Sequence, residues 1–313
     1  MVRKCYGPRD SEVMPERVAT YVARISERTQ DRLEQFPSLV RLKRAVWKTI
    51  RNRLPNTKII DGLPLFVPHS AGSTKNLAML TLDAADRSFP LLVEFVSIDG
   101  RRIEDPVPVL SFLDTDSKKA AADRLMTLFS QFGSDKSTLH DYHFVYGSII
   151  VDPDSVTDVL EIGLGSNNPD LVSNMGNQKQ TRPGGSLRAF REFLPQARIC
   201  GADVDEAILF EEERIRTFFV DQTEPDSFDR LSHLIPEEFD LIIDDGLHSP
   251  HANIATLLFG LKHLKVGGWH VVEDIAHPAL PLWQLISAMM PEHYESHIVE
   301  TKAAYVFLVR RSQ

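Results

Sequence analysis

The chain has few cysteines, no long apolar run and a shortage of positive charge. Only Cys5 and Cys200 occur in 313 residues, too few for a disulfide framework, so we expect a reducing compartment. No apolar run approaches the roughly 18 residues that cross a bilayer, and the first residues lack the apolar core of a secretory signal. These absences predict a cytoplasmic protein with no membrane partner.

Acidic residues outnumber basic ones, 44 to 35, which gives a net charge of -9. Surfaces that hold nucleic acid through phosphate contacts are usually basic, so we expect no nucleic-acid partner. A local basic stretch over residues 40–55 is explained more simply as the solvated face of an amphipathic helix.

The hydrophobic pattern is mixed before about residue 150. Helical spacing over residues 14–53 and 117–131 predicts helices. Short apolar runs broken by Pro and Gly predict strands at 58–68, 76–83, 89–100 and 107–114. We therefore expect an N-terminal α+β accessory region over residues 1–130 and a second domain over residues 131–313.

After residue 155, strand-length apolar runs alternate with helical stretches. The predicted strands are 157–163, 197–203, 215–220, 239–245 and 267–274, and the predicted helices are 185–194, 206–214, 226–235 and 250–265. Such alternation implies right-handed crossovers and a parallel sheet covered on both faces. Two final runs, 294–300 and 304–310, predict an antiparallel edge hairpin. The expected fold class is α/β: a Rossmann-like doubly wound sheet, mostly parallel, with an antiparallel edge hairpin.

An acidic residue stands at the end of each of these five strands. In an open α/β sheet, ligands bind beyond the carboxyl ends of the strands. Asp203 would suit a ribose diol, and Asp221 with Gln222 could read an adenine edge. The strand ends are Glu161, Asp203, Asp221–Gln222, Asp244–Asp245 and Glu273–Asp274. A single such acid is more often a turn former or helix cap than a ligand, so the prediction of a nucleotide-like ligand rests on the ordered set.

The first strand runs into a glycine turn, 161-EIGLG-165. Gly163 and Gly165 would let the backbone approach a ligand that Glu161 could hydrogen-bond. A dinucleotide site instead needs G-x-G-x-x-G leading directly into a helix. Here a loop of 18 residues, 166–183, intervenes; a loop of this length is often functional. The turn is therefore a poor cradle for pyrophosphate.

Together, EIGLG, 201-GADVD-205, 220-VDQ-222 and 242-IIDDG-246 resemble the class I S-adenosylmethionine-dependent methyltransferases, over residues 155–310. More narrowly, the stretch 183–205, DDGLH and 271-VVEDI-275 resemble the metal-dependent sugar O-methyltransferases of macrolide biosynthesis and the related cephalosporin hydroxylase-like proteins. The lead-in 133-GSDKSTLHDYHFVY-146 is similar to a segment that covers the cofactor in that group.

The resemblance implies S-adenosylmethionine and Mg²⁺ as cofactors. Besides the strand-end residues, it implies cofactor contacts from Lys136, His140 and Ser186, with Asp244 on the cofactor side. It implies that Asp245, Glu273 and Asp274 hold the metal, and that Asp245 and His248 are catalytic, His248 as the general base.

Elementary chemistry agrees with this assignment. Adjacent strands lie about 4.8 Å apart, so carboxylates at neighbouring strand ends can converge on one cation. An all-oxygen site suits Mg²⁺ better than zinc, and a histidine with a pKa of about 6.5 can accept a hydroxyl proton. The resemblance then implies methyl transfer to a hydroxyl of a sugar or glycosylated small molecule.

Two other functions stay open. One keeps the fold but acts on another diol, such as a catechol. The other is a non-catalytic partner that binds S-adenosylmethionine within a biosynthetic complex, although a scaffold has no need of a complete acid cluster. The resemblance also implies a homo-oligomer, built partly by the N-terminal region.

Overall fold

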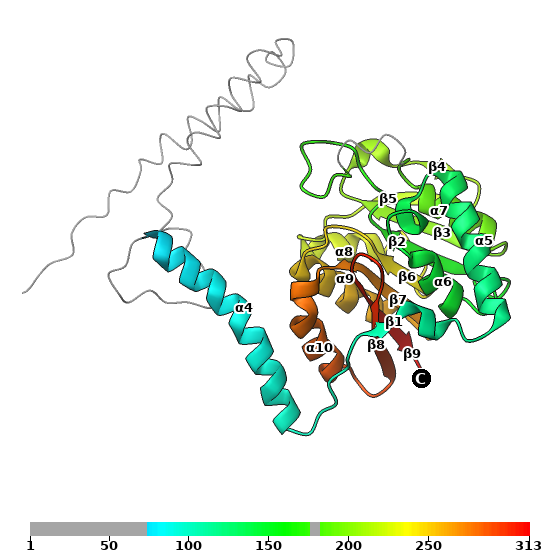
Figure 1. Ribbon diagram of the computed structural model, residues 1–313. Coiled ribbons are helices and arrows are strands. Elements are labelled where there is room, and N and C mark those ends of the chain that lie inside the picture. The colour runs from blue at the N-terminus through cyan, green and yellow to red at the C-terminus, as the bar shows by residue number, and fades with distance from the viewer. Residues whose placement is uncertain (1–73, 176–181) are drawn as a thin grey trace, which may run out of the picture. The chain divides into compact units, whose positions relative to one another are not determined.

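The computed structural model describes residues 74–175 and 182–313. Within them lies a nine-stranded sheet with the order β1-β8-β9-β7-β6-β2-β3-β5-β4 (Figure 1). The strands are β1 (Val107–Pro108), β2 (Asp158–Ile162), β3 (Arg198–Asp203), β4 (Glu211–Glu212), β5 (Ile215–Phe219), β6 (Phe239–Asp244), β7 (Leu264–Ile275), β8 (Tyr294–Glu300) and β9 (Tyr305–Arg311).

The centre of the sheet is parallel. Strands β5, β3, β2, β6 and β7 pair in parallel, in that spatial order. At one side β9 runs antiparallel to β7, and β8 pairs antiparallel with β9, forming the predicted hairpin. The predicted fold class is confirmed: a Rossmann-like, mostly parallel sheet with an antiparallel edge.

Helices cover both faces of the sheet (Figure 1). One face packs on α5 (Asp116–Phe132), α6 (Tyr142–Ile149) and α7 (Gly185–Phe193), and the other on α8 (Pro225–Ser232), α9 (Pro250–His263) and α10 (Leu280–Met289). Strand residues alternate between the two cores: Val159 faces the α5–α7 side, and Leu160 faces the α8–α9 side. This two-sided burial explains why the strands are continuously apolar.

Several predicted elements are wrong. The strands expected at 76–83 and 89–100 fall on one helix, α4 (Thr74–Ile98), which contains Pro90, and on the turn that follows it. Leu91, Phe95 and Ile98 recur at helical spacing, but a short apolar run interrupted by proline also reads as a strand. Of the strand expected at 107–114, only β1 is extended, and the 3-10 helix η1 (Val109–Phe112) follows it.

The helix expected at 206–214 is also wrong. A 3-10 turn, η3 (Glu206–Ile208), is followed by β4, which pairs antiparallel with β5. Arg214 has a positive φ of 59°, which a helix does not allow. The carboxylate of Glu212 is held by Arg188 of α7 at 2.7 Å. Pairing at the sheet edge and this tertiary ion pair therefore override the local helical propensity.

Contacts divide the chain into residues 1–85 and 86–313, and the functional division predicted at residue 130 stays a prediction. Helix α5 crosses that boundary and packs on α6 and α7. The helix predicted at 14–53 and the strand predicted at 58–68 lie outside the described residues. In the described ranges, no helix has both the length and the apolar character to cross a membrane.

Candidate active site

A cavity of about 500 Å³ opens at the carboxyl ends of the parallel strands. Eleven of the predicted site residues line it: Lys136, His140, Gly163, Gly165, Asp203, Asp221, Gln222, Asp245, His248, Glu273 and Asp274. They come from five strand ends and from the segment between α5 and α6. Chain topology therefore brings together residues that are more than 130 positions apart in the sequence.

The glycine turn after β2 forms one wall of this cavity. Gly163 and Gly165 have φ values of 97° and 81°, which side-chain-bearing residues rarely adopt. A Cβ on Gly163 would also collide with the backbone carbonyl of Asp245. The turn is thus packed directly against the end of β6, and glycine at 163 is required by both conformation and space.

Two of the predicted nucleotide-contacting acids already have backbone partners. Asp203 accepts hydrogen bonds from the amides of Leu164 at 2.7 Å and Asp205 at 2.8 Å, and burial raises its pKa. Asp221 accepts from the amide and hydroxyl of Thr223 at 2.8 and 2.7 Å. Both still line the cavity and shape the turns there. Both oxygens of Asp203 are engaged by these amides, whereas Asp221 uses only Oδ1 for Thr223.

Asp244 has a different place from the cofactor side that we expected. It is fully buried and accepts hydrogen bonds from Gln222 Nε2 at 2.8 Å and Asn253 Nδ2 at 3.0 Å. Gln222 Oε1 in turn accepts from the amide of Leu247 at 2.8 Å. This network braces the loop that carries Asp245 and His248, because alternation along β6 turns Asp244 away from the cavity.

Glu161 and Ser186 are likewise buried rather than on the cavity wall. Glu161 at the end of β2 lies 3.3 Å from the ammonium of Lys136. Burial raises the pKa of Glu161 to about 7, although Lys136 opposes the rise. Ser186 lies in the first turn of α7. Both side chains therefore lie in the interior, behind the residues that line the cavity.

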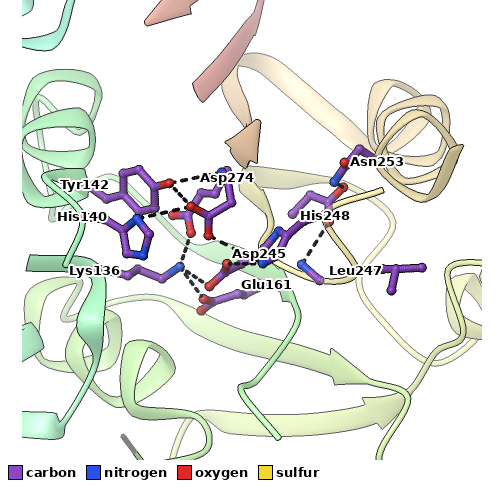
Figure 2. Close-up of polar contacts among 12 residues, drawn as sticks. Lys136, His140, Tyr142, Glu161, Asp245, Leu247, His248, Asn253 and Asp274 are labelled. Carbon is purple, nitrogen blue, oxygen red and sulfur yellow. Dashed lines mark hydrogen bonds and ion pairs between the residues drawn. The ribbon is translucent and has the colours of Figure 1, made fainter. Parts of the chain in front are cut away.

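Lys136 is the centre of the acid cluster (Figure 2). Its Nζ lies 2.6 Å from Asp245 Oδ2 and also contacts Glu273 Oε2. Burial lowers the pKa of Lys136, but the surrounding carboxylates outweigh it and hold the pKa well above its usual value. Burial raises the pKa of Glu273, whereas Lys136 holds the pKa of Asp245 below its usual value despite burial.

Asp245 and Asp274 each have one anchored oxygen. Lys136 holds Oδ2 of Asp245, while the Tyr142 hydroxyl donates to Oδ1 of Asp274 at 2.6 Å and His140 Nδ1 lies 3.2 Å from it. The other two oxygens face His248 Nε2, Asp245 Oδ1 at 3.9 Å and Asp274 Oδ2 at 3.6 Å. Asp245, His248 and Asp274 each offer a ligand atom, and these atoms lie within 4.8 Å of one another. One cation could bind between them.

Glu273, unlike Asp245 and Asp274, has no carboxylate oxygen free of protein partners. Its Oε2 contacts Lys136 and its Oε1 accepts a hydrogen bond from the Tyr146 hydroxyl. Its side chain is 1% exposed, against 21% for Asp274. Of the three predicted metal ligands, the structure therefore orients Asp245 and Asp274 toward the open space and engages Glu273 within the protein.

Asn253 was not predicted as a site residue, and the contacts of Tyr142 and Tyr146 with the acid cluster were not foreseen. The two tyrosines are four residues apart on α6, so they lie on one helix face and reach Asp274 and Glu273 respectively. That spacing was the available signal. Asn253 lies in the first turns of α9, and no pattern in the sequence pairs it with Asp244.

Comparison with known proteins adds a second line of evidence. Over 193 residues the chain is 32% identical to an 8-demethyl-8-alpha-L-rhamnosyl tetracenomycin-C 2'-O-methyltransferase of Streptomyces olivaceus, covering 59% of this chain and 47% of that protein. Over 118 residues it is 36% identical to the mycinamicin VI 2''-O-methyltransferase of Micromonospora griseorubida, covering 37% and 27%. The chain is similar to sugar O-methyltransferases. The resemblance inferred from its motifs is therefore confirmed.

The chain spans less than half the length of these two curated relatives. Among solved structures, it matches the MycE methyltransferase from the mycinamycin biosynthetic pathway in complex with Mg and SAH. That match has 26% identity and a TM-score of 0.49, and covers 61% of this chain and 55% of the other. No family model matches the sequence.

Proposed function

We propose that this chain is a Mg²⁺-dependent O-methyltransferase that moves a methyl group from S-adenosylmethionine to a hydroxyl of a sugar or glycosylated small molecule. The observation that carries the proposal is the pair of unanchored oxygens, Asp245 Oδ1 and Asp274 Oδ2, which face His248 across an open space. The acceptor class is supported by the names of the two Streptomyces and Micromonospora relatives, which are sugar O-methyltransferases.

The cavity fits the methyl donor. Its volume of about 500 Å³ lies in the range of small-molecule and cofactor sites. Gly163 and Gly165 would admit the donor close to the backbone, and Asp203 and Asp221 would accept from its hydroxyl and amino groups. S-Adenosylmethionine supplies an electrophilic sulfonium methyl group when bound. The chain's part is to place an acceptor oxygen in line with that methyl group, since proximity supplies much of the rate.

Asp245 and Asp274 would hold Mg²⁺ most directly, because each presents a free carboxylate oxygen to the same space. Glu273 becomes available as a third ligand only if its contacts with Lys136 and Tyr146 open. When bound, Mg²⁺ orients substrate oxygens and stabilises an alkoxide. Hard oxygen donors of this kind suit Mg²⁺.

His248 would take the proton of the acceptor hydroxyl at Nε2. The ring lies beside both free carboxylate oxygens, and its side chain is 37% exposed. Exposure leaves a route for the proton to leave for solvent. The arrangement therefore provides one group that would remove the hydroxyl proton, and two carboxylate oxygens that would hold the cation next to the resulting negative charge.

Turnover with and without a chelator tests the proposal. With S-adenosylmethionine and a panel of glycosides and catechols, we expect methyl transfer that EDTA abolishes and added Mg²⁺ restores, with glycosides as the better acceptors. Binding of S-adenosylhomocysteine, measured by calorimetry, should persist in EDTA. Full turnover in excess chelator would contradict the metal requirement, and absence of S-adenosylhomocysteine binding would contradict the proposed activity as a whole. A homo-oligomeric state in the cytoplasm remains part of the proposal.

A further inference from the structure

A single buried ammonium group joins three strands at the candidate site. Lys136 lies in the 3-10 turn η2 (Asp135–Ser137), which packs on α5 and α6, and its side chain is only 2% exposed. From there its Nζ reaches three carboxylates, one from each of three adjacent strand ends (Figure 2). They are Glu161 of β2, Asp245 just after β6, and Glu273 of β7.

These contacts leave Lys136 with little capacity for the cofactor. Of the three protons on Nζ, two are donated to Asp245 and Glu273, and Glu161 lies within ion-pair distance at 3.3 Å. The ammonium also lies 5.9 Å from the ring centre of Tyr142, which closes another side. The geometry is that of an internal counter-ion and differs from the cofactor contact that the sequence analysis assigned to this residue.

The counter-ion divides the acid cluster into an inner and an outer part. The inner oxygens, Asp245 Oδ2 and Glu273 Oε2, contact Lys136. The outer oxygens, Asp245 Oδ1 and Asp274 Oδ2, face the open space near His248. Because a carboxylate anchored through one oxygen has less rotational freedom, Lys136 also fixes the direction in which Asp245 presents the other.

We propose that Lys136 is a positioning residue for the cation site, which fixes Asp245 and reduces the negative charge that the cluster presents to a divalent cation. The proposal rests on the cation site of the proposed function. A cation held by fewer carboxylate charges binds less tightly and keeps more coordination positions for acceptor oxygens. Lys136 thus keeps the cation exchangeable and the site accessible to substrate.

Binding of Mn²⁺ and of S-adenosylhomocysteine to the full chain separates this role from a cofactor contact. Mn²⁺ replaces Mg²⁺ as an EPR-visible probe, and calorimetry measures S-adenosylhomocysteine. In Lys136→Met, removal of a unit positive charge beside the cation should tighten Mn²⁺ binding about tenfold. S-Adenosylhomocysteine affinity should stay within about twofold, and turnover at saturating Mn²⁺ should fall about tenfold or more because Asp245 is no longer aligned.

Three variants are the controls. Lys136→Arg retains the charge, so its Mn²⁺ affinity should remain within about threefold of the parent. Tyr146→Phe removes the other partner of Glu273 without changing the charge, so the same limit applies. Lys118→Met removes a lysine whose Nζ is paired with Asp114 at 2.8 Å and which does not line the cavity, and it should change neither binding nor turnover. Lys136→Gln carries the same expectation as the methionine variant if the latter does not fold.

Unchanged or weaker Mn²⁺ binding in Lys136→Met and Lys136→Gln would overturn the proposal. So would a large loss of S-adenosylhomocysteine affinity with Mn²⁺ binding unaltered, which would restore the cofactor contact. Equal tightening in Tyr146→Phe would show that freedom of Glu273, and not charge, governs the site, and would also overturn it. If the parent chain binds neither Mn²⁺ nor S-adenosylhomocysteine, the proposed function itself has failed, which is a separate outcome.

Discussion

His248 Nε2 lies 3.6 Å from Asp274 Oδ2, and both residues have a left-handed backbone, with φ of 52° and 55°. For residues other than glycine such conformations cost about 1–3 kcal/mol each and persist where the surroundings enforce them. Here His248 lies in the loop after β6, Asp274 lies at the irregular end of β7, and both line the cavity. The strain turns the imidazole toward the free carboxylate oxygens, which favours a chemical role for both side chains.

The first prediction concerns His248. In His248→Ala we expect kcat to fall by about 10²–10⁴, the usual contribution of a general base. Binding of S-adenosylhomocysteine should remain within about twofold, since the ring contacts carboxylates and not the glycine turn. Single-turnover kinetics and calorimetry measure the two effects. The neighbouring His251, which is exposed and bonded to Ser249 at 2.8 Å, provides the matched control: His251→Ala should retain full turnover. An unaltered rate in His248→Ala would remove the histidine from catalysis.

The second prediction separates Asp244 from Asp221. Asp244→Ala leaves the Asn253 amide without its acceptor and removes one of the two acceptors of Gln222 Nε2, and each unsatisfied N–H costs about 1–3 kcal/mol. We therefore expect the free energy of unfolding to fall by about 2–4 kcal/mol in urea titrations. Asp221→Ala, at the cavity wall, should leave stability within about 0.5 kcal/mol and weaken S-adenosylhomocysteine binding. The opposite pattern would place Asp244 on the cofactor.

The strand ends were predictable because topology alone determines them. Once the alternation of strands and helices is recognised, parallel strands must end at one edge of the sheet, so Asp203, Asp245 and Asp274 must gather there. Which oxygen faces the ligand depends on pleat and side-chain packing. The sequence therefore does not reveal that Asp244 and Glu161 turn inward while Asp245 faces the cavity.

The contribution of the segment 133–146 to the candidate site could not be predicted from the sequence, because it depends on tertiary packing. Lys136 reaches Glu273 across 137 positions of sequence, and no local pattern specifies that distance. The helix predicted at 206–214 failed for a related reason. Its residues have ordinary helical propensity, but strand β5 and the side chain of Arg188 were available to pair with them. Propensity is a weak prior where such partners exist.

The third prediction concerns Gly163, whose φ of 97° and closeness to the carbonyl of Asp245 exclude a side chain. Gly163→Ala should displace the loop that carries Asp245 and lower both S-adenosylhomocysteine affinity and turnover by about tenfold or more. Gly267→Ala is the matched control. Its φ is 84°, but a Cβ there meets nothing within 4 Å. It should cost about 1 kcal/mol of stability from backbone strain alone and leave turnover intact. Equal activity in the two variants would show that the close contact at Gly163 is unimportant.

The fourth prediction concerns His270, a fully buried histidine of β7. Neither of its ring nitrogens has a hydrogen-bond partner among the described residues, and the ring packs against Gly260 of α9. Burial lowers its pKa from 6.5 to about 3, because a charged imidazole without a partner is costly in an apolar interior. The folded chain therefore keeps His270 neutral at pH values where the unfolded chain protonates it.

Because the unfolded state binds more protons between pH 6.5 and about 3, His270 must destabilise the fold progressively as the pH falls through that window. From pH 6 to pH 4 its share is about 2.5 kcal/mol. In His270→Leu we expect urea titrations to show a pH dependence flatter by about that amount, with little change above pH 7. His233→Gln, at the exposed end of α8, is the control and should retain the parent's pH dependence. A parallel pH profile for His270→Leu and the parent would mean that the buried imidazole takes up its proton without unfolding.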